Sequence, residues 1–152
     1  MKRARVALPA AVVAVAFLAV IAGGHALAGP NRPFNTALGP GDVTVTLTIQ
    51  HSHFSPDRVS VRPGTTVHFV VHNTDPIGHE LIVGDAEVHR RHEAGTEPIH
   101  PPRPGEISVP AQTTAETTFS FAATGESSVV YACHLPGHFR YGMWGEVDIV
   151  PS

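Results

Sequence analysis

The side chains best suited to metal chemistry lie in one short segment near the C-terminus. Residues 131 to 143 have the sequence YACHLPGHFRYGM, in which Cys133 is followed by His138 and Met143 at intervals of five residues. A thiolate, an imidazole and a thioether are ligands that suit copper, and two histidines and a cysteine with a distant methionine form one known copper arrangement. The segment therefore predicts a copper site that still lacks one imidazole.

His79 is the histidine best placed to complete this set. It follows the turn at residues 73–78 and begins a short apolar stretch, soon after the apolar run at residues 67–71. Consecutive strands are usually neighbours in space, so such a residue can meet a loop that is distant in sequence. His72 is the alternative ligand.

Each ligand also has an ordinary use without metal. Cys133 is the only cysteine, so it cannot form an internal disulfide and must be free, paired with another chain or bound to metal. A free cysteine is often a small buried hydrophobe, and methionine commonly packs in a core. The combined spacing of Cys133, His138 and Met143 favours the metal site.

Short β-strands are the elements that must position these ligands. Runs of β-branched and aromatic residues between Pro- and Gly-containing turns predict strands at residues 43–50, 58–61, 66–72, 79–83, 106–109, 117–121, 129–133 and 144–150. No stretch supports a long amphipathic helix. Seven or eight such strands indicate an all-β, antiparallel sandwich with Greek-key connections. The polar, proline-rich segment at about 85–105, which contains His89, His92 and His100, is expected to be a His-rich loop inserted between strands.

The N-terminus has the pattern of an export signal. Three basic residues among the first five precede an apolar run at residues 6–21, and Ala26-Leu27-Ala28 fits an A-x-A cleavage site. The protein is therefore expected to be extracytoplasmic, which means secreted, periplasmic or at the cell surface. An uncleaved anchor is the alternative, and only then would we expect membrane association. The predicted divisions are a signal peptide at 1–28, a linker at 29–41 and one domain at 42–152.

The composition of the exported part excludes some partners. The signal carries three of the ten Lys and Arg residues and none of the thirteen Asp and Glu residues, which leaves seven basic residues against thirteen acidic ones. This acidic balance argues against nucleic acid as a partner. Ten of the eleven histidines also remain, and metal binding is a usual reason for such an excess.

The C-terminal segment resembles the ligand loop of the cupredoxins. The pattern Cys133-x-x-Pro-Gly-His138-x-x-x-Gly-Met143 is similar to that of rusticyanin and sulfocyanin, and more distantly to auracyanin, azurin and plastocyanin. The resemblance covers residues 42–150 and includes the spacing from Asn73 to His79. It implies an eight-stranded sandwich with one type 1 copper ion held by His79, Cys133, His138 and Met143, and one-electron transfer as the activity.

Two neighbours of the ligands are part of this resemblance. It implies that the Leu135 amide donates a hydrogen bond to the Cys133 sulfur. Glu80 departs from the pattern, because cupredoxins usually carry Asn, Ser or Thr at that position. A carboxylate there is expected to favour Cu(II) over Cu(I).

The other histidines do not indicate an enzyme. Multicopper oxidases carry histidine on both sides of the cysteine, but residue 132 is alanine, so we expect His134 not to bind metal. Oxygen reduction also needs several His-x-His pairs, and His51-Ser52-His53, which we expect to face solvent, is the only one. Irregularly spaced ligands for a second site that would bind Cu(II) or Zn(II) are also present: His89, His92, Glu93 and His100.

The expected function is one-electron transfer by an exported, monomeric copper protein. A redox partner is predicted to dock near His138, where Leu135, Pro136, Gly137 and Phe139 with Pro76 and Ile77 would form an apolar rim. The alternative is extracytoplasmic copper buffering or delivery, with the His-rich loop as the acceptor. The amount of copper bound and its exchange rate separate the two.

Overall fold

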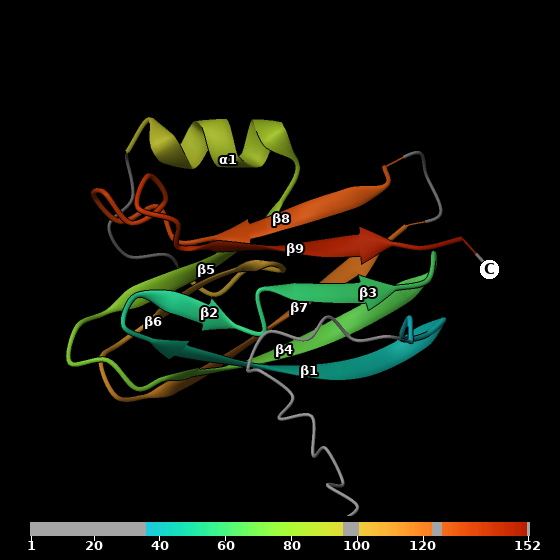
Figure 1. Cartoon of the computed structure of the whole chain (residues 1–152), viewed down its shortest axis with the longest axis horizontal. Helices are drawn as coiled ribbons and strands as arrows, with labels where there is room; N and C mark the ends of the chain where they lie inside the picture. Colours follow the sequence, from blue (N-terminus) through green and yellow to red (C-terminus); the bar gives the residue numbers. More distant parts are fainter. Residues whose placement is uncertain (1–35, 96–100, 123–125, 152) are drawn as a thin grey trace, which may run out of the picture.

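The computed structural model describes residues 36–95, 101–122 and 126–151, which form two β-sheets packed face to face (Figure 1). One sheet has the strand order β2-β1-β4-β7 and the other has the order β3-β9-β8-β5-β6. The first sheet consists of β1 (Gly41–Gln50), β2 (His53–Ser55), β4 (Thr65–Asn73) and β7 (Thr114–Phe121). The second consists of β3 (Arg58–Val61), β5 (His79–Gly84), β6 (Glu106–Val109), β8 (Ser128–Ala132) and β9 (Trp144–Ile149). The predicted all-β sandwich is confirmed.

The sheets are mixed, so the expected antiparallel arrangement does not hold for every pair of strands. β1 pairs in parallel with β4, and β3 pairs in parallel with β9. Parallel neighbours need a crossing connection, and residues between β1 and β4 supply one through β2 and β3. The described residues contain nine strands rather than seven or eight, because β2 has only three residues and is too short to show an alternating pattern.

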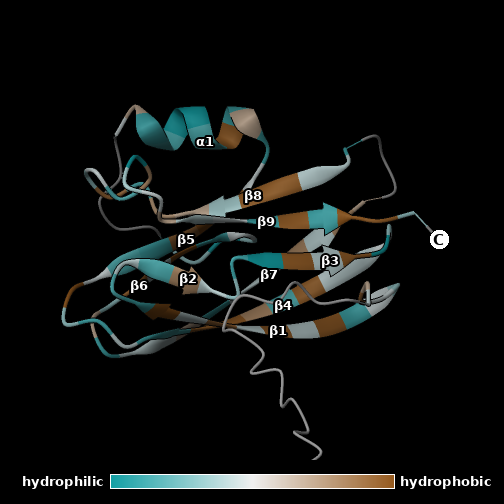
Figure 2. Cartoon of the chain, in the orientation of Figure 1, coloured by the Kyte–Doolittle hydropathy of each residue, from teal (hydrophilic) through white to brown (hydrophobic). Residues whose placement is uncertain are grey.

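Alternation of buried and exposed residues builds the core between the sheets. Val45, Leu47 and Ile49 of β1 are buried at every second position, and β4 repeats the pattern with Val67, Phe69 and Val71. These side chains belong to one apolar cluster with residues from the second sheet. Figure 2 shows the hydrophobic segments distributed along the strands of both sheets. Because this core is closely packed, the strand ends that carry the candidate ligands are held rigidly.

Tyr131 of β8 fixes the position of the strands beside the predicted ligand loop. Its ring is fully buried and meets Phe54 of β2 edge to face, with 5.4 Å between the ring centroids. Its hydroxyl donates to the Pro56 carbonyl over 2.7 Å. A side chain at Gly145 would overlap this ring, so β9 can lie against Tyr131 only because residue 145 is glycine.

The predicted His-rich loop contains a helix, α1 (Ala86–Glu93), which the sequence analysis did not foresee. Asp85 caps its N-terminus, since the carboxylate accepts a hydrogen bond from the Val88 amide over 2.9 Å. α1 lies beside β5 and β8, outside the sandwich, and most of its surface is hydrophilic (Figures 1 and 2). A Cβ atom at Gly84 would lie 2.6 Å from Val88 Cβ, so glycine allows this close approach of helix and strand. His89 is the buried residue of the helix.

The predicted signal peptide lies outside the described residues, as does most of the predicted linker. Within residues 36–41, Leu38 forms a parallel bridge with Val61, the last residue of β3. Its amide donates a hydrogen bond to the Ser60 carbonyl over 2.9 Å. In the part of the chain that the structure describes, no helix has the length and apolar character needed to cross a membrane.

Candidate metal centre

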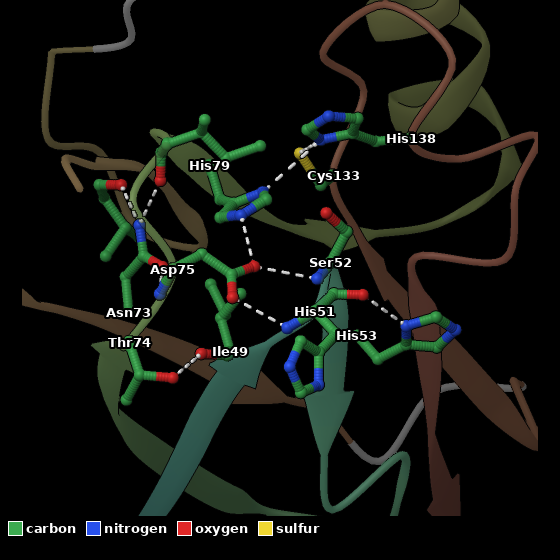
Figure 3. Close-up of polar contacts among 12 residues, drawn as sticks. Ile49, His51, Ser52, His53, Asn73, Thr74, Asp75, His79, Cys133 and His138 are labelled. Atoms are coloured by element: carbon green, nitrogen blue, oxygen red, sulfur yellow. Dashed lines mark hydrogen bonds and ion pairs between the residues drawn. The ribbon is translucent and has the colours of Figure 1, made fainter. Parts of the chain in front are cut away.

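Three of the four predicted ligands meet at one end of the sandwich (Figure 3). His79 begins β5, Cys133 follows β8, and His138 lies in the loop between β8 and β9. The His138 Nδ1 atom is 3.2 Å from Cys133 Sγ and 3.3 Å from His79 Nδ1. All three ligand atoms lie within 4.8 Å of one another. One ion can bind all three, because metal–nitrogen bonds are about 2.0 Å and metal–sulfur bonds about 2.3 Å long.

The ligand loop, which comprises residues 133–143 between β8 and β9, is closed by its own backbone hydrogen bonds. The Cys133 amide donates to the Met143 carbonyl over 3.1 Å, and the Met143 amide donates to the His138 carbonyl over 3.0 Å. Gly137 and Gly142 have φ angles of 89° and 94°, which glycine adopts without strain. These tight turns bring His138 back towards Cys133 from five residues further along the chain.

Met143 lies in the same closed loop and is buried, with 1% of its surface exposed. It belongs to the apolar cluster that also contains Cys133. This position is compatible with the predicted axial ligand, and that role for Met143 stays a prediction.

Cys133 lies in an apolar environment, and backbone amides lie near its sulfur. Burial raises the pKa of the Cys133 thiol to about 12, although hydrogen bonds from the amides of Leu135 and Glu80 act in the opposite direction. This influence of the Leu135 amide on the thiol agrees with the hydrogen bond expected from the sequence. A thiol of this kind gives up its proton when a metal ion binds, because the ion supplies the positive charge that the site lacks.

His138 differs from the other two ligands because it is only half-buried. Burial lowers the pKa of its imidazole, and repulsion from the His79 ring whenever that ring is protonated acts in the same direction. The ring is therefore neutral at neutral pH, which is the form that binds metal.

Asp75 orients His79, and the sequence analysis missed it. The His79 Nε2 atom is 3.0 Å from the Asp75 carboxylate, which requires the ring hydrogen to be on Nε2 and leaves the Nδ1 lone pair facing the candidate site. The carboxylate also accepts hydrogen bonds from the amides of His51 and Ser52, each over 2.7 Å (Figure 3). Burial opposes ionisation of Asp75, but these amides and His79 outweigh it and lower the pKa of the carboxyl group.

Asn73 holds the turn that precedes His79. Its side-chain amide donates to the carbonyls of Ile77, Val109 and Pro110 at 2.8, 3.1 and 3.0 Å. Its side-chain oxygen accepts from the Asp75 amide over 3.0 Å. The spacing from Asn73 to His79, noted in the sequence, thus has a structural cause: Asn73 fixes both the turn and the aspartate that orients the ligand.

Glu80 joins β5 to the ligand loop. It is buried, with 2% of its surface exposed, and its carboxylate accepts a hydrogen bond from the His134 amide over 2.7 Å. The charge of Glu80 also acts to raise the pKa of Cys133. The expectation that this carboxylate favours Cu(II) over Cu(I) stays a prediction.

The remaining predicted residues lie away from this group. His72, the alternative to His79, is exposed and bonds to the Thr114 hydroxyl over 2.7 Å. His51 and His53 are exposed, as expected. His100 lies outside the described residues.

Comparison with known proteins agrees with the donor set. A family model described as copper binding proteins of the plastocyanin/azurin family matches residues 41–150. The copper-resistant cuproprotein CopI of Rubrivivax gelatinosus is 32% identical over 121 residues, covering 78% of this chain and 72% of that protein. The protein of the same name from Pseudomonas aeruginosa is 26% identical over 182 positions, covering 95% of this chain and 97% of that protein.

Solved structures share the fold at low sequence identity. Auracyanin from Roseiflexus castenholzii has a TM-score of 0.59 and 17% identity, covering 76% of this chain and all of that one. Rusticyanin from Thiobacillus ferrooxidans has a TM-score of 0.51 and 18% identity, covering 76% of this chain and 85% of that one. Both similarities concern the sandwich.

The role of Asp75 can be tested with Asp75→Asn. An amide cannot supply the negative charge that holds the Nε2 hydrogen of His79, so we expect copper affinity to fall about 10- to 100-fold. Titration with Cu(II) against a competing chelator measures the change. Asp148→Asn, which alters a surface carboxylate paired with Arg58, is the matched control and should bind copper like the wild type. Equal affinities for the two variants would show that Asp75 does not position the ligand.

Proposed function

The chain belongs to the plastocyanin/azurin family of copper-binding proteins, and we propose that it carries single electrons outside the cytoplasm through one type 1 copper centre. The family match also confirms the resemblance drawn from the ligand loop. The observation that carries the proposal is the His79, Cys133 and His138 group at the rigid end of the sandwich. Met143 completes the proposed ligand set.

The proposed mechanism depends on keeping these ligands fixed. Copper supplies a reversible change between Cu(I) and Cu(II) when it is bound. Asp75 holds the His79 ring, and the backbone bonds of the loop hold His138 and Cys133. The apolar core excludes water from the cysteine, which is fully buried. Ligands that cannot move far make both oxidation states tolerable in one geometry, so little rearrangement accompanies each electron.

The half-buried His138 is the proposed exit for the electron. Two exposed apolar side chains lie close in sequence to the histidine ligands. Tyr141, three residues after His138, is 82% exposed, and Ile77, two residues before His79, is 49% exposed. Exposed aromatic and apolar groups of this kind are common where proteins dock. Phe139, expected in this rim, instead packs against the rings of His89 and His134, with centroid distances of 6.1 and 4.8 Å.

The location outside the cytoplasm rests on the N-terminal sequence. The basic residues, apolar run and A-x-A site predict export, and the acidic balance of the rest of the chain disfavours nucleic acid as a partner. A monomer that meets its redox partner near His138 follows from the same proposal.

Copper tolerance is a second candidate function, favoured by the names of the relatives. Two of them are called copper-resistant cuproproteins. In this alternative the protein takes up copper and stores it or passes it on. A store must release its ion, whereas a carrier must retain copper in both oxidation states.

Voltammetry of the copper-loaded protein with a Cu(I) chelator in solution separates the two functions. A carrier gives a reversible one-electron wave that persists over repeated cycles, because the buried ligands hold the reduced ion. Copper bound to His72→Gln, which changes an exposed histidine away from the site, should behave in the same way. Loss of the wave after the first reduction, with copper appearing on the chelator, would contradict the carrier and favour delivery.

The docking surface is tested on an electrode coated with a methyl-terminated monolayer. Tyr141→Glu places a charge beside the proposed exit, so we expect electron transfer to slow about tenfold, the factor that corresponds to 1.4 kcal/mol of lost contact. Thr118→Glu adds the same charge to an exposed position of β7 in the other sheet and should leave the rate unchanged. Equal rates for the two variants would place the exit elsewhere.

A further inference from the structure

A second group of histidines lies between α1 and the ligand loop. His134 directly follows Cys133, and its Nε2 atom is 2.8 Å from Nδ1 of His89 on α1. The two ring centroids are 5.1 Å apart, and the ring of Phe139 stacks on His89 with an interplanar angle of 5°. Figure 1 shows α1 beside β8, whose C-terminal end leads into the ligand loop. The helix therefore brings an imidazole to the side of the loop that the first site does not use.

The surroundings of His89 determine which of its nitrogens is available. Its Nε2 atom is 3.1 Å from the Gly84 carbonyl and 3.2 Å from the Val130 carbonyl, and both oxygens can only accept. Nε2 therefore carries the hydrogen, and Nδ1 presents a lone pair towards His134. An imidazole whose second nitrogen is held by a backbone carbonyl is arranged as metal-binding histidines usually are.

His92 of α1 is arranged in the same way one turn later. Its Nδ1 atom is 2.7 Å from the Val88 carbonyl, which places the hydrogen there and leaves Nε2 with the lone pair. That Nε2 atom is 3.7 Å from a carboxylate oxygen of Glu106, and the ring stacks on His134 with 5.8 Å between centroids. An imidazole and a carboxylate thus border the pair formed by His89 and His134.

We propose that His89 and His134 form the core of a second metal site, bordered by His92 and Glu106, and that this site binds Cu(II). Two nitrogens 2.8 Å apart can both reach one ion, since metal–nitrogen bonds are about 2.0 Å long. Imidazole and carboxylate suit Cu(II), which such ligands bind more strongly than the other divalent ions of the first transition row. The site lies beside the first one and shares none of its ligands.

The proposal changes two expectations from the sequence. His134 was expected not to bind metal because residue 132 is alanine, but its partner comes from α1 and not from the other side of Cys133. Of the four residues expected to form a second site, namely His89, His92, Glu93 and His100, the proposed site keeps the first two. Glu93 is exposed, whereas Glu106 of β6 lies next to His92.

The test adds Cu(II) in steps to untagged protein. The first equivalent loads the cysteine site and is read from its visible absorption. The second is followed by calorimetry and by electron paramagnetic resonance, where we expect a new signal split by nitrogen ligands. We expect His134→Gln to raise the dissociation constant of the second ion at least tenfold and His92→Gln to raise it about threefold. Neither variant should change the visible absorption of the first ion. Thermal unfolding checks that both variants are folded.

His72→Gln is the matched control, because His72 is exposed on β4 and bonds only a threonine hydroxyl among the contacts described for its side chain. It should leave the second dissociation constant unchanged. The proposal is overturned if His134→Gln binds the second ion as the wild type does, if His72→Gln weakens it equally, or if Zn(II) resists displacement by Cu(II). A missing first absorption would count against the proposed electron carrier and not against this second site.

Discussion

The hydrogen bond from His79 Nε2 to the Asp75 carboxylate is the contact on which the geometry of the candidate centre depends. Asp75 receives two backbone hydrogen bonds from the turn between β1 and β2 and directs the imidazole of His79 through its Nε2 atom. Its own turn is held by Asn73, which donates to the carbonyl of Val109, the last residue of β6, and to that of Pro110, the residue after it. One carboxylate therefore ties both sheets of the sandwich to the orientation of a single ligand, so distortion of either sheet would reach the site.

The ligand loop has two sides with different chemistry. Cys133 belongs to the apolar cluster shared by the sheets, where burial keeps the thiol protonated until a bound metal ion displaces the proton. The next residue, His134, lies on the α1 side, and its amide is held by the buried carboxylate of Glu80. Adjacent residues of an extended chain face opposite ways, so a helix beside the loop can approach without disturbing the cysteine. This arrangement explains how one short loop can serve a buried centre and contact a second group of imidazoles.

Local patterns predicted much of this structure, and long-range contacts account for what they missed. The strands predicted at 58–61 and 106–109 have the observed bounds, and the ligand group was found because its chemistry lies in one loop and one strand end. The parallel pairing of β1 with β4 is set by a connection and leaves no periodic signal. Asp75 looked like a turn residue, because the amides that identify it lie 23 and 24 positions earlier. Helix α1 was missed because eight mostly polar residues with one buried histidine lack an apolar stripe.

The visible absorption spectrum of the purified protein after addition of one equivalent of Cu(II) tests the central claim most directly. Copper bound by the thiolate of Cys133 gives an intense charge-transfer band, and Cys133→Ser abolishes it because serine offers no sulfur. A weak spectrum that Cys133→Ser leaves unchanged would contradict the account, since copper would then be bound by histidines elsewhere in the chain.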